Sequence, residues 1–217
     1  MGIFLTFEGV EGSGKSVQIR RTQGYLTQRG VVCRITREPG GTEFGRDLRH
    51  VLLHARGAQR EPMSELLLYL ADRYQHLKEV VQPALARGEI VLSDRYHDAT
   101  RAYQGAARGV PGEIIDALAR TLDIPEPTGT ILLDIDPEIG LARARGRNQT
   151  EGSAESEGRF EAEDIAFHKA VREAYLDLAR KSPERIQVIS GTGTEEEVFA
   201  RIAPALERWL GATRARN

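Results

Sequence analysis

The chain has 217 residues, which suits one substantial α/β domain and leaves too few for two independent ones. Its 30 Lys and Arg residues against 32 Asp and Glu residues give a net charge of -2, which excludes the broad basic surface of a sequence-independent nucleic-acid binder. The single cysteine, Cys33, excludes an internal disulfide. With no basic N-terminal segment and no apolar stretch near 18 residues, we expect no signal peptide, no membrane span and a cytoplasmic location.

Five short runs of β-branched or aliphatic residues alternate along the chain with longer segments of helical period. The runs cover residues 3–7, 31–36, 90–93, 130–135 and 186–189. This alternation predicts an α/β fold in which helices cover both faces of a parallel sheet. The last helical segment opens with Thr194 and Glu197 in the spacing of a capping box, and its apolar residues then follow one face. We therefore expect that helix to dock on the core.

Two segments lack this pattern. Residues 148–158 contain Gln, Thr, Ser, Gly and three glutamates with no apolar side chain larger than alanine, a composition typical of a solvated, mobile loop. The C-terminal residues 211–217 are expected to fray.

A phosphate-binding motif lies between the first strand and the first helical segment. The sequence GVEGSGKS, residues 9–16, matches GxxxxGK[ST] in the strand–loop–helix context that the motif requires. Its glycines let backbone N–H groups converge on phosphate oxygens, Lys15 reaches the β and γ phosphates, and Ser16 is a ligand for Mg²⁺. The predicted ATP-binding residues are Gly9, Gly12, Ser13, Gly14, Lys15 and Ser16.

The motif indicates ATP and Mg²⁺ as cofactors without fixing the reaction. A GTPase would need an NKxD segment, yet the only asparagines, Asn148 and Asn217, do not begin one, and the LSGGQ-like segment of a transporter ATPase is absent. A small-molecule kinase remains, with a partitioning-type ATPase switch as the rival from another class.

Four further segments accompany the phosphate loop. They are TREPGGT at 36–42, DRY at 94–96, YQG at 103–105 and RFE at 159–161. Together these motifs resemble those of bacterial thymidylate kinases, from about residue 3 to residue 210. The resemblance implies a P-loop NTPase fold with a five-stranded parallel sheet of order 2-3-1-4-5, a mobile lid around 143–160 and a homodimer. It also implies phosphorylation of dTMP to dTDP by ATP; another pyrimidine nucleotide kinase or a deoxynucleoside kinase is the alternative.

The polar motifs follow predicted strands, where ligands of open parallel sheets bind. Arg37 and Arg95 suit a bidentate clamp on the acceptor phosphate, and Asp94 suits a carboxylate that holds Mg²⁺ or orients the acceptor. The resemblance also implies that Tyr69 stacks on the thymine ring and that Arg73 donates a hydrogen bond to a carbonyl oxygen of that ring. It further implies that Arg49 binds the acceptor phosphate, that Thr100 and Gln104 lie near the pyrimidine edge, that Tyr103 crowds the 2′ carbon and that Glu11 contacts the 3′-hydroxyl. Glu38 of the TREPGGT segment completes the predicted substrate site.

Position 12 of the phosphate loop carries glycine where one class of thymidylate kinases has a basic residue. The resemblance is therefore to the class that supplies its transition-state cation from the lid, where Arg143, Arg145, Arg147 and Arg159 lie. The predicted catalytic residues are Lys15, Asp94, Arg95, Arg147 and Arg159.

Overall fold

The computed structural model describes residues 2–54, 60–151 and 158–214, and for 147–151 and 212–214 it describes the backbone alone. The strands are β1 (Ile3–Glu8), β2 (Cys33–Arg37), β3 (Ile90–Asp94), β4 (Gly129–Asp134) and β5 (Ile186–Ser190). The α-helices are α1 (Lys15–Thr27), α2 (Glu43–Leu53), α3 (Pro62–His76), α4 (Gln82–Ala86), α5 (His97–Thr100), α6 (Gly112–Thr121), α7 (Pro137–Glu151), α9 (Ile165–Lys181) and α10 (Glu195–Arg214). Two π-helical segments, η1 (Leu77–Val81) and η2 (Arg101–Ala107), and one 3-10 turn, η3 (Phe160–Ala162), join them.

The strands form one parallel sheet of order β2-β3-β1-β4-β5, which confirms the predicted fold class and strand order. In the centre, Leu5 of β1 pairs with Leu92 of β3 on one side and with Gly129 of β4 on the other. Phe7 and Arg37 both pair with Asp94, so the carboxyl ends of β1, β2 and β3 meet at one edge of the sheet.

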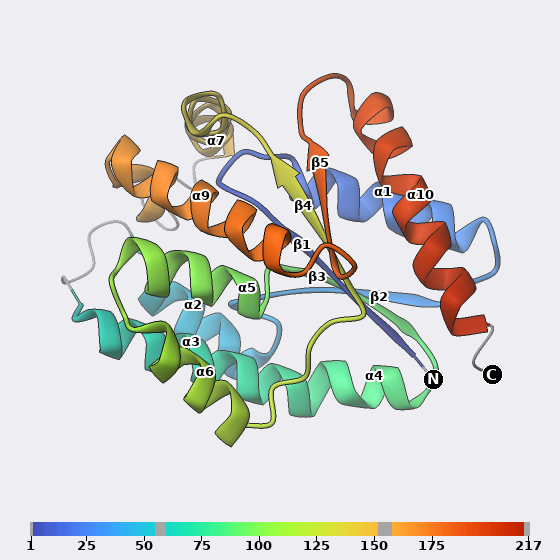
Figure 1. The fold of residues 1–217 in the computed structure, drawn as a ribbon, viewed down its shortest axis with the longest axis horizontal. Helices are drawn as coiled ribbons and strands as arrows, with labels where there is room; N and C mark the ends of the chain where they lie inside the picture. The colour runs from blue at the N-terminus through green and yellow to red at the C-terminus, as the bar shows by residue number, and fades with distance from the viewer. Residues whose placement is uncertain (1, 55–59, 152–157, 215–217) are drawn as a thin grey trace.

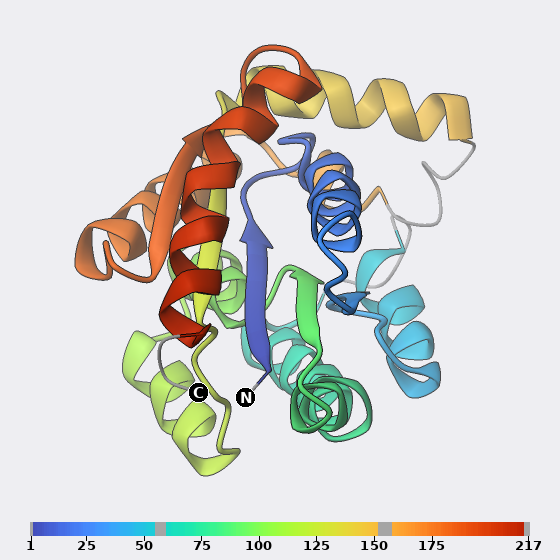
Figure 2. The same ribbon diagram turned by 90° about the vertical axis from the view of Figure 1, so that its right-hand side faces the viewer.

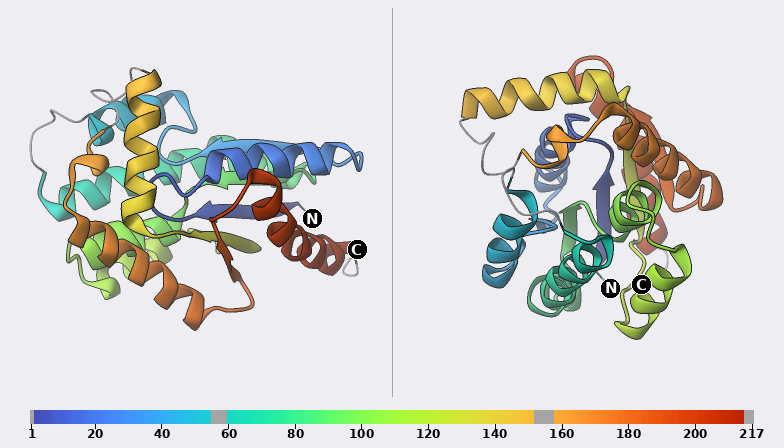
Figure 3. Two further views of the ribbon diagram at one scale, coloured as in Figure 1. Left: turned by 90° about the horizontal axis from the view of Figure 1, so that it is seen from above. Right: turned by 90° about the vertical axis from the view of Figure 1, so that its left-hand side faces the viewer.

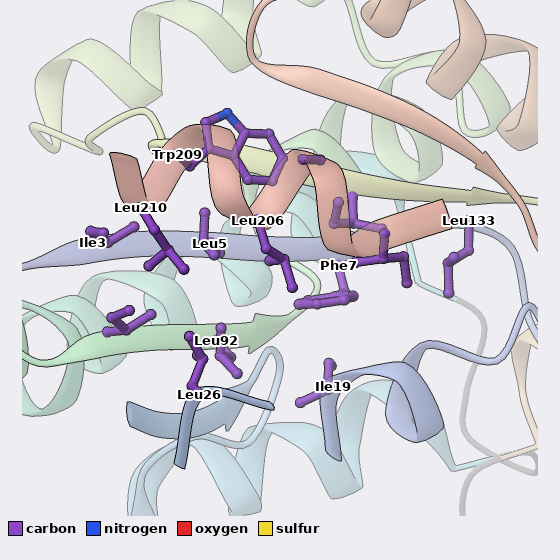
Figure 4. Close-up of a cluster of buried hydrophobic side chains, with 14 of the residues drawn as sticks. Ile3, Leu5, Phe7, Ile19, Leu26, Leu92, Leu133, Leu206, Trp209 and Leu210 are labelled. Atoms are coloured by element: carbon purple, nitrogen blue, oxygen red, sulfur yellow. The ribbon is translucent and has the colours of Figure 1, made fainter. Parts of the chain in front are cut away.

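Helices α1 and α10 cover one face of the sheet (Figure 1). The buried cluster beneath them joins alternate residues of β1 with apolar residues of both helices, and Leu206 and Leu210 point from α10 toward β1 (Figure 4). A Cβ at Gly129 would lie 2.2 Å from the Trp209 ring, so only glycine leaves room for that indole. The last helix therefore docks on the core as expected, and its Thr194–Glu197 capping box forms with two reciprocal hydrogen bonds.

The opposite face is covered by α3, η1, α4, α5 and α9 (Figure 1). Phe4 and Val91 point to this side and pack on Leu77 and Val81 of η1. Further along the sheet, Leu132 belongs to a second cluster built mainly from α9 and η2. Because the central strands are apolar on both faces, they form the rigid floor below the loops at their carboxyl ends.

Two helices run further than the sequence composition indicated. Helix α7 continues to Glu151, so the expectation of a loop from residue 148 is wrong for 148–151, whereas 152–157 lie outside the described residues. Helix α10 continues to Arg214, past the start of the expected frayed tail, and 215–217 lie outside the described residues. Helix α7 crosses beyond the carboxyl ends of the strands, close to the start of α1 (Figures 2 and 3). Among the described helices, none has the length and apolarity to cross a membrane.

Candidate active site

A cleft of about 560 Å³ opens at the carboxyl ends of β1, β2 and β3. Its walls come from the phosphate loop, the segment after β2, helix α3, and the segment from Asp94 to Gln104. Of the predicted site residues whose side chains are described, all but Arg159 line this cleft. Gly9, which has no side chain, also lies outside the lining of the cleft. The side chain of Arg147 lies outside the described part of the chain.

The phosphate loop needs its glycines for backbone geometry and for space. Gly9, Gly12 and Gly14 all have positive φ angles, of 138°, 68° and 95°. A Cβ at position 12 would lie only 2.0 Å from the carbonyl oxygen of Gly140 in α7. A basic side chain at position 12 is therefore incompatible with this placement of α7, which favours a catalytic cation from elsewhere.

Lys15 is buried and folded back on its own loop. Its Nζ donates to the carbonyl oxygens of Gly9 and Val10 at 3.0 Å each and lies 3.3 Å from Oγ of Ser13. Burial, reinforced by the positive charge of Arg95, lowers the pKa of Lys15 to about 8. A phosphate group in the loop would replace these neutral partners with an anionic one.

Ser16 and Asp94 come from different elements and meet at the floor of the cleft. The Ser16 hydroxyl donates to Oδ2 of Asp94 at 3.0 Å. Hydroxyl and carboxylate oxygens are hard ligands of the kind that Mg²⁺ prefers, so this pair fits the predicted metal role. His50 and His54 lie four positions apart in the sequence, but they are not part of any cluster of three or more metal-ligating side chains among the described residues.

Half-buried Arg95 and buried Glu11 form an ion pair between the phosphate loop and η2. Arg95 has a positive φ of 70°, and its Nη2 donates to Oε1 of Glu11 at 2.7 Å. The Tyr103 hydroxyl donates to the same oxygen at 2.6 Å, while the Arg95 guanidinium lies over the Tyr103 ring. Burial alone would raise the pKa of Glu11, but Arg95, His168, Lys15 and Tyr103 hold it well below its usual range. Glu11 is therefore ionised at the place where the sequence predicted a sugar contact.

Arg73 is almost fully buried, with 1% of its surface exposed. Its Nε donates to Glu38 at 2.7 Å, its Nη1 to the Thr100 hydroxyl at 2.8 Å and its Nη2 to the carbonyl oxygen of Tyr96 at 2.9 Å. These partners fix the guanidinium beside the cleft, where the sequence predicted recognition of a base. Glu38 thus holds Arg73 and leaves direct substrate contact to the arginine.

Comparison with known proteins decides which family this site belongs to. The family model described as thymidylate kinase matches residues 7–202. The chain is 46% identical over 207 residues to a thymidylate kinase of Desulfosudis oleivorans, covering 95% of this chain and 97% of that protein. It is 47% identical over 218 residues to one of Syntrophotalea carbinolica, covering 100% and 98%. The crystal structure of thymidylate kinase from Ehrlichia chaffeensis matches with a TM-score of 0.74 at 30% identity, covering 94% of this chain and 98% of that one.

The chain belongs to the thymidylate kinase family. This confirms the predicted resemblance and the predicted class of enzyme, a kinase rather than an ATPase switch. Enzymes of the thymidylate kinase family phosphorylate dTMP to dTDP, which is the reaction that the sequence predicted.

The remaining residues expected from the family lie around the same cleft. Tyr69 is half-buried in its wall, and the side chain of Arg37 is exposed there and makes no hydrogen bond or ion pair with a described residue. Arg49 donates to the carbonyl oxygen of Pro39 at 3.0 Å. Gln104 donates to Glu65 at 2.9 Å, so a buried carboxylate orients its amide.

The arginines that the sequence analysis expects in the lid, where their side chains are described, all contact other parts of the protein. Arg143 and Arg145 donate to the carbonyl oxygens of Gly191, at 3.4 Å, and Glu161, at 2.8 Å. Arg159 donates to the carbonyl oxygen of Leu52 at 3.0 Å and forms an ion pair with Glu65. A family member that uses one of these as its catalytic cation must therefore release it from such a contact.

Sequence reasoning missed several buried polar residues behind the cleft. Glu8 accepts from the Tyr96 backbone at 2.7 Å and from the Tyr175 hydroxyl at 2.7 Å. Burial, with the nearby charge of Asp98, raises the pKa of Glu8 to about 8. The only signal for Glu8 was a charged residue ending an otherwise apolar strand.

A second missed group supports the segment after β2. Nδ1 of His76 lies 2.8 Å from Glu38, and Asp72 accepts from the Gly40 backbone at 3.0 Å. Burial, with the charge of Glu38, raises the pKa of Asp72 to about 7. The DRxxH spacing of α3 places Asp72, Arg73 and His76 within one turn, which was the available signal.

Proposed function

We propose that the chain transfers the γ-phosphoryl group of ATP to the 5′-phosphate of dTMP within this cleft, in the reducing cytoplasm that suits its free Cys33. The observation that carries the proposal is that a phosphate loop and a buried arginine on a second wall line one cleft. Phosphoryl transfer depends mainly on positioning and charge stabilisation, and the two walls supply these for donor and acceptor separately.

On the donor side, the loop amides and Lys15 bind the β and γ phosphates. Lys15 exchanges the carbonyl oxygens of Gly9 and Val10 for phosphate oxygens, and the gain in negative charge restores its proton affinity. Ser16 and Asp94 would hold Mg²⁺, which neutralises charge on the phosphates when it is bound.

On the acceptor side, Arg37, Arg49 and Arg95 bind the 5′-phosphate of dTMP and aim it at the donor. Tyr69 stacks on the thymine ring, and Arg73 donates a hydrogen bond to its carbonyl oxygen. Thr100 and Gln104 lie along the base edge, Tyr103 crowds the 2′ position, and Glu11 accepts from the 3′-hydroxyl. The catalytic cation comes from the lid, with Arg147 and Arg159 as the candidates.

The test is one coupled assay of ADP release across dTMP, dUMP, dCMP, dGMP and thymidine. We expect dTMP to exceed dUMP modestly, because one methyl group in an apolar contact contributes about 1 to 3 kcal/mol. Purine monophosphates should react poorly because they do not fit the same stack. Equal turnover of dGMP and dTMP would refute the pocket, turnover of thymidine would favour a deoxynucleoside kinase, and ATP hydrolysis indifferent to every acceptor would favour an ATPase switch.

We also propose that two copies of the chain pair through α2 and α3. These adjacent helices expose the large apolar side chains Phe44, Val51, Met63, Leu67 and Tyr74. Their spacings of four and seven residues place them on one face of each helix, so together they form one apolar surface.

Sedimentation of the variant Leu67→Asp tests this pairing. We expect the variant to sediment as a monomer at concentrations where the unaltered chain is a dimer. Val32→Asp is the matched control, because Val32 is also exposed and apolar but lies outside that surface. A dimeric Leu67→Asp would contradict the assignment of the interface.

A further inference from the structure

His168 lies fully buried in α9 between two parts of the active site. On one side, its Nε2 is 3.0 Å from the carbonyl oxygen of Phe160, which is the first residue of η3 and the last residue of the expected lid. On the other side, its Nδ1 is 3.3 Å from Oε2 of Glu11 in the phosphate loop. One imidazole ring therefore bridges the end of the lid and the acidic residue of the loop.

Both oxygens that face the ring are acceptors. A carbonyl oxygen and an ionised carboxylate donate no hydrogen, so each ring nitrogen must carry its own proton to be satisfied. Glu11 is held ionised by the charges of Arg95 and Lys15 and by the Tyr103 hydroxyl, together with His168 itself. A ring that donates to both oxygens uses one nitrogen for each of them.

The two oxygens of Glu11 have different surroundings. Oε1 accepts from both Arg95 and Tyr103, at 2.7 Å and 2.6 Å. Oε2 of Glu11 and Nδ1 of His168 are both buried without a well-aligned hydrogen-bond partner within the described part of the chain, and they lie 3.3 Å from each other. Oε2 is thus the oxygen left to accept from a substrate, and His168 is the group that limits where it can turn.

We propose that His168 is a positioning residue that orients Oε2 of Glu11 toward the 3′-hydroxyl of the acceptor nucleotide. The inference rests on the proposed contact between Glu11 and that hydroxyl. The carbonyl oxygen of Phe160 holds the ring at Nε2, and the ring in turn limits the position of Oε2 of Glu11 at Nδ1.

Two substitutions separate the two contacts of the ring. The amide nitrogen of glutamine reaches about as far as Nε2, so His168→Gln keeps the donor to Phe160 and loses the one to Glu11. The amide nitrogen of asparagine corresponds to Nδ1, so His168→Asn keeps the donor to Glu11. The measured quantity is the ratio of kcat/KM for dTMP to kcat/KM for its 3′-deoxy analogue, with Glu11→Gln as the reference.

We expect the ratio to fall about tenfold or more in His168→Gln, because it loses the nitrogen that lies 3.3 Å from the ionised carboxylate of Glu11. His168→Asn should retain a ratio within about threefold of that of the unaltered chain, and Glu11→Gln should lose it. A merely structural role would lower both kcat/KM values together and leave the ratio unchanged. If the ratio falls in Glu11→Gln but is fully retained in His168→Gln, the proposed role of His168 is wrong. If the ratio is retained in Glu11→Gln, the proposed contact between Glu11 and the sugar is wrong, and this inference fails with it.

A measurement on the unaltered chain keeps the proposal falsifiable if the variants fold poorly. The ¹⁵N chemical shifts of the His168 ring at neutral pH should show two protonated nitrogens. A neutral ring with one unprotonated nitrogen would overturn the proposal.

Discussion

Lys15 on the donor wall and Arg73 on the acceptor wall are both buried cations, but they are held by different partners. Lys15 contacts two carbonyl oxygens and a hydroxyl of its own loop, and its pKa is lowered to about 8. Arg73 forms an ion pair with Glu38 at 2.7 Å and two further hydrogen bonds to Thr100 and the Tyr96 backbone. Within the described part of the chain, no carboxylate contacts Lys15 directly, whereas Arg73 already has Glu38 as a counter-ion.

The difference between these two cations indicates how each wall of the cleft binds its substrate. Donor groups, including Ser16 and Asp94, make contacts within the protein that phosphate and metal must replace. On the acceptor wall, the guanidinium of Arg73 is fixed before the nucleotide arrives, so little entropy is lost in ordering it on binding. Changes on the donor side and in the lid should therefore appear mainly in kcat, and changes on the acceptor wall should appear in the use of dTMP.

The largest effect is expected from the lid. Among Arg143→Ala, Arg145→Ala, Arg147→Ala and Arg159→Ala, one variant should lose on the order of 10³-fold or more in kcat, because arginines that stabilise this transition state contribute that much. Its dissociation constant for dTMP should barely change, since the contact forms only in the transition state.

Arg95→Ala is the contrasting variant for this series. Its contact with the acceptor phosphate exists in the ground state, so it should weaken dTMP binding as well as the rate. If all four lid variants keep near-normal kcat, the cation does not come from the lid and the interpretation of Gly12 is wrong.

The next effect concerns the donor wall itself. Lys15→Ala should reduce kcat by on the order of 10²- to 10³-fold, because it removes a preorganised positive charge from the transferring phosphate. Its melting temperature should stay close to that of the unaltered chain, since the groups of the described residues that accept from Lys15 are neutral groups of the loop. Retention of more than a tenth of kcat would contradict the assigned role.

Contiguous features of this molecule could be predicted from sequence, and features assembled from distant segments could not. The phosphate loop spans eight consecutive residues, and the strands are short apolar runs, so local pattern was sufficient for both. The partners of Arg73 come from residues 38, 96 and 100, which only the folded sheet brings together. The missed Glu8 depends likewise on Tyr175, which is 167 positions away.

The end of α7 was misjudged for a different reason. Residues 148–151 carry polar side chains that suggested a loop, but Gln and Glu are also good helix formers and extend a helix that is already nucleated. Composition alone does not separate an exposed helix end from a solvated loop.

A smaller effect is expected on the acceptor wall. In Arg73→Lys a single ammonium replaces a guanidinium with three fixed partners, so kcat/KM for dTMP should fall by about 10- to 100-fold. The KM for ATP should change little, because the donor wall is separate. Equal losses of kcat/KM for dTMP and for ATP would show that Arg73 only supports the fold. Glu38→Gln is the matched variant, because it weakens the same ion pair from the other partner.

The smallest effect tests the boundary between the two walls, where Glu8 ends β1 next to the phosphate loop and contacts Tyr96 and Tyr175. Burial and the charge of Asp98 raise the pKa of Glu8 from 4.5 to about 8 in the folded state. Between these values the folded chain binds more protons than the unfolded chain, so the free energy of unfolding falls as pH rises from 4.5 toward 8. Glu8→Gln removes this titration and should flatten the fall, as measured by urea unfolding across that range. Asp72→Asn is the control, because the pKa of Asp72 is raised to about 7 and its removal should flatten the curve only below that pH. If Glu8→Gln follows the same pH curve as the unaltered chain, Glu8 is ionised throughout, and the donor wall contains a fixed negative charge like that of Glu38 on the acceptor wall.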